Sequence, residues 1–348
     1  TMFMNEVEVV KSLEKSKYFV EDDSLADYIF VQTHPYLYMM CNHKVENGHH
    51  GKALLHAANI YNYVVVPWLR RTDPMWDQSD GSRYIFLFSF GASNMLINDA
   101  HSIHNSVLLS VSGDSNNGIW RALSLRNKII TIPAFINPIV ALTGKNEKFT
   151  ENSTVNMTLA HFRGIVDPLL IYSFGTRQSL LSWTRNNSDF PIIFEVDTVS
   201  REEFVEEVLA SKFGLCLPGW FRFTPRPADY TVAGVIPVIV GDGLVHPFSN
   251  LIDWSLFSIS IKESDVLKQP RQIFSMLSNM TGQEINRRRE IMSDIRRYLV
   301  WEIKGGNAWD GIVFELGMLM PKEPRPTNTV LSPNNSTKNK HDHQWVGQ

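Results

Sequence analysis

The sequence predicts an α/β protein made of two doubly wound, Rossmann-like domains. A chain of 348 residues suggests two domains, because single hydrophobic cores rarely grow beyond about 250–300 residues. In both halves, short segments rich in β-branched and aromatic residues alternate with helical patterns, as expected for parallel strands joined by helices. A polar stretch over 142–156 separates the halves and is the expected linker. We therefore place an N-terminal domain over 1–150 and a C-terminal domain over 151–320.

In the N-terminal half, a helix is expected before a series of strands. Apolar residues at helical spacing predict the helix over 7–20, and the apolar run 24–31 predicts a short strand. Tyr61 to Val66 leads into an expected loop over 67–83. Aromatic and β-branched runs then predict strands at 84–90, 106–111 and 128–132.

In the second half, a helix is expected to begin just after Gly175. Ser200 and Glu203 form a capping box that predicts the next helix. A long amphipathic helix is expected over 283–301, and a late helix could cross back to the first domain. Residues 321–348 are rich in Pro, Asn and Lys, so we expect a disordered tail there.

The most informative segment is 213–242, which predicts a buried strand, a Gly/Pro turn, a short helix and a second buried strand. Thr224 is the expected N-cap of that helix, and Gly234 is expected to end it in a left-handed conformation. This order puts a helix N-terminus at the carboxyl edge of a parallel sheet, where open α/β folds bind nucleotides. Arg226 and Asp229 are three residues apart and share one helix face, so they suit a pyrophosphate and a ribose, respectively.

Composition excludes several other classes of protein. The formal net charge of −3 gives no basic field for nucleic acid. Only two cysteines, Cys41 and Cys216, are present, and Cys216 lies in an apolar strand, which favours a buried free thiol. The chain contains no Walker loop and no Gly-x-Gly-x-x-Gly, which disfavours a dehydrogenase. No apolar run approaches the roughly 18 residues that span a bilayer.

The segment 225–260 resembles the exostosin-like glycosyltransferases of family 47. The helix Pro225-Arg-Pro-Ala-Asp229 is similar to the family's Pro-Arg-x-x-Glu, and Gly234-Val-Ile-Pro-Val238 to its Gly-x-x-Pro-Val strand. The residues from Pro247-Phe248 to Asp253-Trp-Ser-Leu-Phe257 resemble the family's continuation. The resemblance extends more loosely over most of 16–320.

The resemblance implies two Rossmann-like domains facing a cleft, the GT-B arrangement. It implies inverting transfer of a sugar from a nucleotide sugar, most readily a UDP-sugar, to a glycan hydroxyl. No cofactor is expected, and no metal, because arginines and a helix N-terminus can offset the pyrophosphate charge. The resemblance further implies a Golgi enzyme with a type II membrane anchor upstream of this sequence, and allows a homo- or hetero-dimer with another glycosyltransferase.

The resemblance also suggests the donor contacts. Arg226 and Arg177 are expected to bind the diphosphate, with a surface or interdomain ion pair as the alternative for Arg177. Asp229 is expected at the ribose, although its side chain is one methylene shorter than the usual glutamate. The remaining expected contacts are Gly164, which could instead serve a turn, Gly219, Thr224, and Asp242, which could instead cap a turn.

The catalytic base is expected from the N-terminal half, across the cleft. Many relatives carry His-Asp-Phe-Gly where this chain has Phe88-Ser-Phe-Gly91, so both polar groups are replaced. The candidates are Asp99, His101 and His104, which could equally form a polar helix face, and His34. The alternative function is therefore a non-catalytic partner that binds a nucleotide sugar or a glycan beside an active glycosyltransferase.

Overall fold

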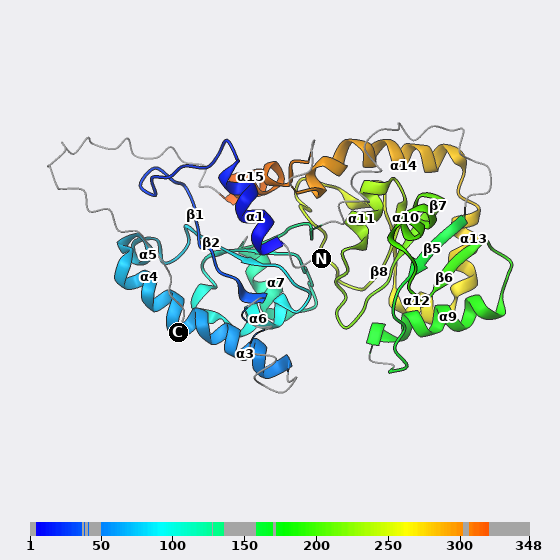
Figure 1. The fold of residues 1–348 in the computed structure, drawn as a ribbon, viewed down its shortest axis with the longest axis horizontal. Coiled ribbons are helices and arrows are strands. Elements are labelled where there is room, and N and C mark those ends of the chain that lie inside the picture. The colour runs from blue at the N-terminus through cyan, green and yellow to red at the C-terminus, as the bar shows by residue number, and fades with distance from the viewer. Residues whose placement is uncertain are drawn as a thin grey trace.

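The computed structural model describes residues 5–36, 38, 41, 50–126, 128–135, 158–169, 172–301 and 306–319. Figure 1 shows two α/β halves side by side. One half contains a four-stranded parallel sheet and the other a five-stranded parallel sheet, which confirms the predicted fold class. The expected linker over 142–156 and the expected tail over 321–348 lie outside the described residues.

The N-terminal sheet has its strands in the order of the sequence. They are β1 (Ile29–Phe30), β2 (Tyr84–Phe88), β3 (Val107–Ser110) and β4 (Ile129–Thr131), and every neighbouring pair is parallel. Parallel pairing sends the chain after each strand to the same edge of the sheet. The helical elements are α1 (Asn5–Glu14), α3 (His50–Ile60), η2 (Tyr61–Val65), α4 (Val66–Thr72), α5 (Pro74–Ser79), α6 (Ser93–Asp99), η3 (His101–Ile103) and α7 (Gly118–Leu125).

The prediction of a loop over 67–83 is wrong, because most of that segment is helical. Pro74 stands in the first turn of α5, where the missing N–H has no helical partner to lose, whereas Pro67 follows the π-helical turn η2, which continues directly into α4. The side chain of Asp73 caps α5 by accepting a hydrogen bond from Met75 N at 2.9 Å. Trp76 is then buried against the sheet, so tertiary packing stabilises helices too short to persist alone.

The second sheet has the order β6-β5-β7-β8-β9, again parallel throughout. Its strands are β5 (Thr158–Arg163), β6 (Ile192–Glu195), β7 (Ser211–Cys216), β8 (Ile236–Val240) and β9 (Ile259–Ile261). The helical elements are η5 (Tyr172–Gly175), α9 (Thr176–Asn186), α10 (Arg201–Leu209), α11 (Arg226–Ala233), η6 (Trp254–Leu256), α12 (Glu263–Lys268), α13 (Pro270–Ser278), α14 (Gly282–Ile295) and η7 (Arg296–Leu299).

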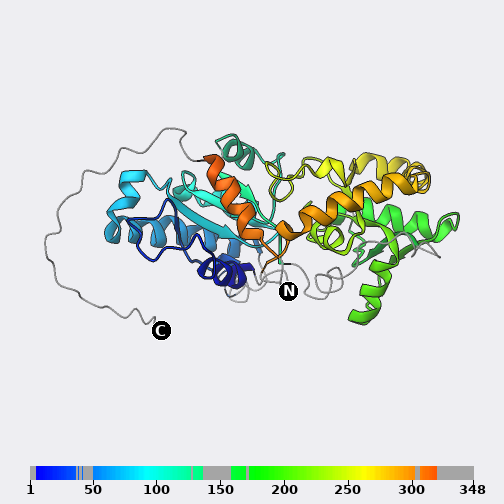
Figure 2. The ribbon, with the colours of Figure 1, turned by 90° about the horizontal axis from the view of Figure 1, so that it is seen from above.

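The final described helix, α15 (Ala308–Leu319), returns to the N-terminal half. Figures 1 and 2 both show it lying over that half. Trp309 Nε1 donates to Val9 O at 3.2 Å, and Tyr28 Oη donates to Leu316 O at 3.3 Å. The helix that crosses back is therefore α15, which follows the amphipathic helix expected over 283–301.

Two further expectations concern the cysteines and membrane-spanning helices. Cys216 is a buried free thiol, as predicted, while Cys41 is free and exposed. In the described residues, no helix has both the length and the apolar character needed to cross a membrane.

Helix α11 packs directly on the backbone of β7. A Cβ atom at Gly214 would lie 2.3 Å from the ring of Tyr230, so the helix approaches as closely as it does only because residue 214 has no side chain. The hydroxyl of Tyr230 lies 3.0 Å from Nδ1 of His161, and both side chains are buried. Together these contacts fix the helix against β5 and β7.

We predict that Gly214→Ala lowers the free energy of unfolding by about 1–3 kcal/mol, because the added methyl overpacks the interface between β7 and α11. Gly118→Ala is the matched control: nothing lies within 4 Å of its built Cβ, so stability should change by less than about 1 kcal/mol. Urea unfolding measures both. Equal stability of the two variants would contradict the packing described here.

Candidate functional site

The centre of the candidate site is a phenyl ring with two guanidinium groups over it. Phe162 is fully buried near the carboxyl end of β5. The guanidinium carbon of Arg226 lies 4.4 Å from the ring centroid and that of Arg177 lies 5.1 Å from it. Cation–π attraction holds each group over the ring, so the strand end and two helix starts meet at one point.

Arg177 is delivered by an unusual backbone segment. Ser173, Phe174 and Gly175 all have positive φ angles, which are strained for the first two. The turn is held by Ser173 N donating to Gly219 O at 2.9 Å and by Thr176 Oγ1 donating to Ser173 O at 2.7 Å. Strain of this kind gathers at functional sites, and here it aims the first turn of α9 at Phe162.

The guanidinium of Arg177 is almost completely buried, at 7% exposure. Nη1 donates to Ile165 O and to Tyr172 Oη, both at 2.7 Å, and Nη2 donates to Leu217 O at 3.1 Å. Burial, reinforced by the neighbouring charge of Arg226, lowers the pKa of Arg177 to about 10. The group therefore stays charged at neutral pH, at a cost in free energy that an anion would offset.

Arg226 fills the space beside Gly164. Its Nη2 donates to Arg163 O at 2.6 Å, and a Cβ at Gly164 would lie 2.7 Å from that nitrogen. Gly164 thus makes room for an arginine, whereas the sequence suggested room for a nucleotide or a turn. Nη1 of Arg226 and Nε of Arg177 are buried without a hydrogen-bond acceptor in the described part of the chain. Both atoms are N–H donors for which an anion would be a strong acceptor.

Two other arginines of this half, Arg163 and Arg222, have carboxylate partners. Arg163 Nε donates to Glu207 Oε2 at 2.9 Å, and Arg222 Nε donates to Glu263 Oε1 at 2.7 Å. Within the described residues, neither Arg177 nor Arg226 has an ion pair of this kind. Two neighbouring cations without a carboxylate form a site for a dianion such as a diphosphate.

Three more predicted donor residues lie near this pair. Helix α11 begins at Arg226 with Pro225 as its N-cap, so the cap lies one residue later than the predicted Thr224, whose Oγ1 accepts from Arg226 N at 3.5 Å. Asp229 lies in the first turn of α11, as expected. Gly219 lies beside Arg177, since a Cβ there would be 3.5 Å from Nη2.

Asp242 lies at the contact between the two halves. It is exposed, and its backbone carbonyl accepts a hydrogen bond from Asn116 Nδ2 at 2.6 Å. Close by, Ser115 N donates to Gly243 O at 2.8 Å and Val245 N donates to Gly113 O at 3.0 Å. The loop after β3 and the loop after β8 are therefore joined by main-chain hydrogen bonds.

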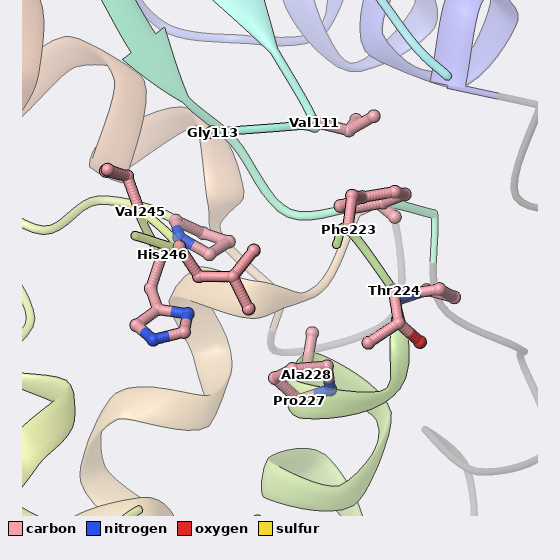
Figure 3. Close-up of a pocket in the computed structure, with 12 residues that line it drawn as sticks. Val111, Gly113, Phe223, Thr224, Pro227, Ala228, Val245 and His246 are labelled. Carbon is pink, nitrogen blue, oxygen red and sulfur yellow. The ribbon is translucent and has the colours of Figure 1, made fainter. Parts of the chain in front are cut away.

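A small pocket lies between these loops and the start of α11 (Figure 3). Its volume is about 30 Å³, room for about one water molecule. His246 lines it and stacks on Trp254, with ring centroids 4.8 Å apart. Burial lowers the pKa of His246 to about 4, so this imidazole is neutral at neutral pH.

The structure does not bring the predicted catalytic group Asp99, His101 and His104 to this pocket. These residues end α6 and precede β3, so they lie at the amino edge of the sheet, whereas the pocket lies beyond the carboxyl edge. His104 Nε2 lies 2.7 Å from Ile97 O, and His101 Nδ1 lies 3.3 Å from Asp99 O. Both rings thus have local structural contacts.

His34 differs from that group, because it follows β1 and therefore lies at the carboxyl edge. The sequence did not single out its neighbour Glu6, nor the shared ring of Phe162. For Phe162, the only hint in the sequence was its place two positions before Gly164. Both depend on contacts between residues far apart in the sequence.

Comparison with known proteins gives a family match and several relatives. The model of the Exostosin GT47 domain matches residues 1–277. A probable glucuronoxylan glucuronosyltransferase of Arabidopsis thaliana is 29% identical over 286 residues, which cover 76% of this chain and 56% of that protein. A probable glucuronosyltransferase of Oryza sativa subsp. japonica is 26% identical, over 77% of this chain and 62% of that protein. The chain thus spans about three fifths of the length of these relatives.

Among solved structures, HepE of Anabaena in complex with UDP is 10% identical, with a TM-score of 0.43, and the match covers 90% of this chain and 82% of that one. OtsA in its apo form is 11% identical, with a TM-score of 0.42 and 79% of each chain covered. The family match covers residues 1–277 and includes the segment 225–260 that carries the resemblance. This chain therefore belongs to the exostosin GT47 family.

Proposed function

We propose that this protein is an inverting glycosyltransferase that moves a sugar from a UDP-sugar to a glycan hydroxyl. The observation that carries the proposal is the pair of guanidiniums over Phe162, one buried and one partly buried, which have no carboxylate partner among the described residues. A diphosphate is the ligand that this charge and these donors fit. The glucuronosyltransferase names of the relatives make UDP-glucuronate the first donor to test.

In the proposed reaction, an acceptor oxygen bonds to the anomeric carbon while the bond from that carbon to the β-phosphate oxygen breaks. The electron pair leaves with UDP, whose growing negative charge Arg177 and Arg226 would stabilise. The acceptor proton passes to a base of the N-terminal half. Because two cations already face the diphosphate, we propose that no metal is required.

The pocket of about 30 Å³ between the halves is smaller than a sugar ring. Main-chain hydrogen bonds such as Val245 N to Gly113 O join the loops on either side of it. We therefore propose that the donor enters when these loops separate and that closure over it excludes water, which would otherwise compete with the glycan hydroxyl.

The alternative is a non-catalytic partner that binds nucleotide sugar or glycan beside an active transferase. Phe88 and Ser89 favour it, because they carry no acid or base at the end of β2. For the catalytic proposal we infer a Golgi enzyme with a membrane anchor outside this sequence, and a dimer with a second glycosyltransferase is compatible with either function.

The function is tested by measuring UDP release with a panel of UDP-sugars, with and without a pooled glycan acceptor. Acceptor-dependent release from one donor is the expected outcome, with UDP-glucuronate the first choice. UDP binding with no release from any donor would favour the non-catalytic partner instead.

We predict that Arg226→Ala weakens UDP binding roughly 10- to 100-fold, because one charge-assisted hydrogen bond is worth about 1.5–3 kcal/mol. Arg289→Ala is the matched control: Arg289 Nε donates to Gly234 O at 3.2 Å, at the far end of α11, so the variant loses the same charge away from the site. Calorimetry of UDP binding measures both. A folded Arg226→Ala protein with wild-type affinity would remove Arg226 from the donor site.

We also predict that turnover persists in EDTA, because the two guanidiniums offset the diphosphate charge. Initial rates in EDTA, and after adding back Mn²⁺ or Mg²⁺, measure this. Activity that EDTA abolishes and Mn²⁺ restores would contradict the metal-free mechanism.

A further inference from the structure

A buried carboxylate lies at the carboxyl edge of the N-terminal sheet, apart from the arginine pair. Glu6 of α1 is 1% exposed. Its Oε1 accepts hydrogen bonds from Ser89 Oγ and from Tyr36 N, both at 2.8 Å. A buried carboxylate is costly unless such donors hold it, and here one donor follows β2 and the other lies soon after β1.

An imidazole lies beside this carboxylate. His34 Nδ1 is 3.8 Å from Glu6 Oε2, an ion-pair distance once the ring is protonated. Nδ1 itself is buried, whereas the His34 side chain as a whole is 38% exposed. The exposed part of the ring therefore lies away from Nδ1. One nitrogen faces a carboxylate and the ring is exposed on its other side, an arrangement suited to a general base.

Three contacts place Glu6 and His34 at the cleft. The ring of Phe90 packs on that of Tyr36, with centroids 5.6 Å apart. A Cβ at the next residue, Gly91, would lie 3.3 Å from the Phe221 ring and 3.4 Å from the Phe223 ring. Phe221 and Phe223 belong to the segment that leads into α11 and the arginine pair. The turn after β2 therefore contacts the carboxylate on one side and the donor half on the other.

We propose that His34 is the general base of the transfer and that Glu6 positions it; this rests on the function proposed above. As the acceptor oxygen bonds to the anomeric carbon and UDP departs with the electron pair of the broken bond, the acceptor proton moves to Nε2 of His34. The imidazolium that forms is stabilised by Glu6 on the Nδ1 side, and it later releases the proton to solvent. Glu6 touches no substrate in this scheme and acts only through His34.

His246 is the rival base, because it lines the pocket between the halves. Burial lowers its pKa to about 4. A base of that strength takes up a proton poorly at neutral pH. In addition, its ring lies against that of Trp254, and no carboxylate among the described residues pairs with it. Of these two histidines, His34 is therefore the better candidate for the general base.

The test measures UDP affinity and acceptor-dependent turnover for His34→Gln, Glu6→Gln, Glu6→Asp and His246→Gln. We expect His34→Gln to lower kcat about 100-fold or more with unchanged UDP affinity, as removal of a general base does. Glu6→Gln should lower kcat less, with partial recovery in Glu6→Asp. His56→Gln is the matched control, because His56 is an exposed histidine on α3 and its loss should leave kcat unchanged.

Chemical rescue separates a base from a structural residue. Added imidazole should restore part of the turnover of His34→Ala and none to Arg226→Ala. Thermal unfolding of each variant reports whether it is folded. A folded His34→Gln enzyme with wild-type kcat, or loss of kcat only in His246→Gln, would overturn the assignment of the base alone. A wild-type chain that neither binds UDP nor transfers sugar would overturn the proposed function together with it.

Discussion

The convergence of two like charges, one of them buried, over one phenyl ring is the constraint on which the donor half depends. Each guanidinium needs acceptors, and main-chain carbonyls of residues 163, 165 and 217 supply them. Those carbonyls can converge only if β5 and β7 are neighbours and the chain after each strand bends toward Phe162. Gly164 gives Arg226 its space, and the strained turn before α9 aims Arg177. The local sequence around the ring is therefore explained by one requirement, to keep two cations together and reachable by an anion.

The N-terminal half meets a simpler requirement, that of parallel pairing. Every strand of its sheet ends at the edge that faces the other half, so His34, Ser89 and the loop at Gly113 arrive together although the sequence separates them. Residues that precede a strand arrive at the opposite edge. This is why His34 and the pair His101 and His104, all histidines of the same half, have such different surroundings. Topology, more than residue type, decides which of them could take part in chemistry at the cleft.

Much of the fold followed from local pattern. The strands around 213–240, the helix at Arg226 and its end at Gly234 were predicted because turn residues, prolines and apolar runs act over a few positions. Helices α4 and α5 were missed, because packing of Trp76 stabilises what the local pattern leaves ambiguous. In the site, Arg226 and Arg177 could be named from the motif. Their shared ring and the role of Gly164 could not, since both depend on contacts across dozens of residues.

The return of α15 makes the chain pass between the halves twice. At the described ends of these passages Trp301 Nε1 donates to Pro133 O at 2.9 Å, and Trp309 of α15 donates to Val9 O. Two connections between the same two halves restrict their relative rotation more than a single connection does. That restriction keeps the start of α11 opposite the carboxyl edge of the N-terminal sheet. A single linker would restrict the position of α11 relative to that sheet less.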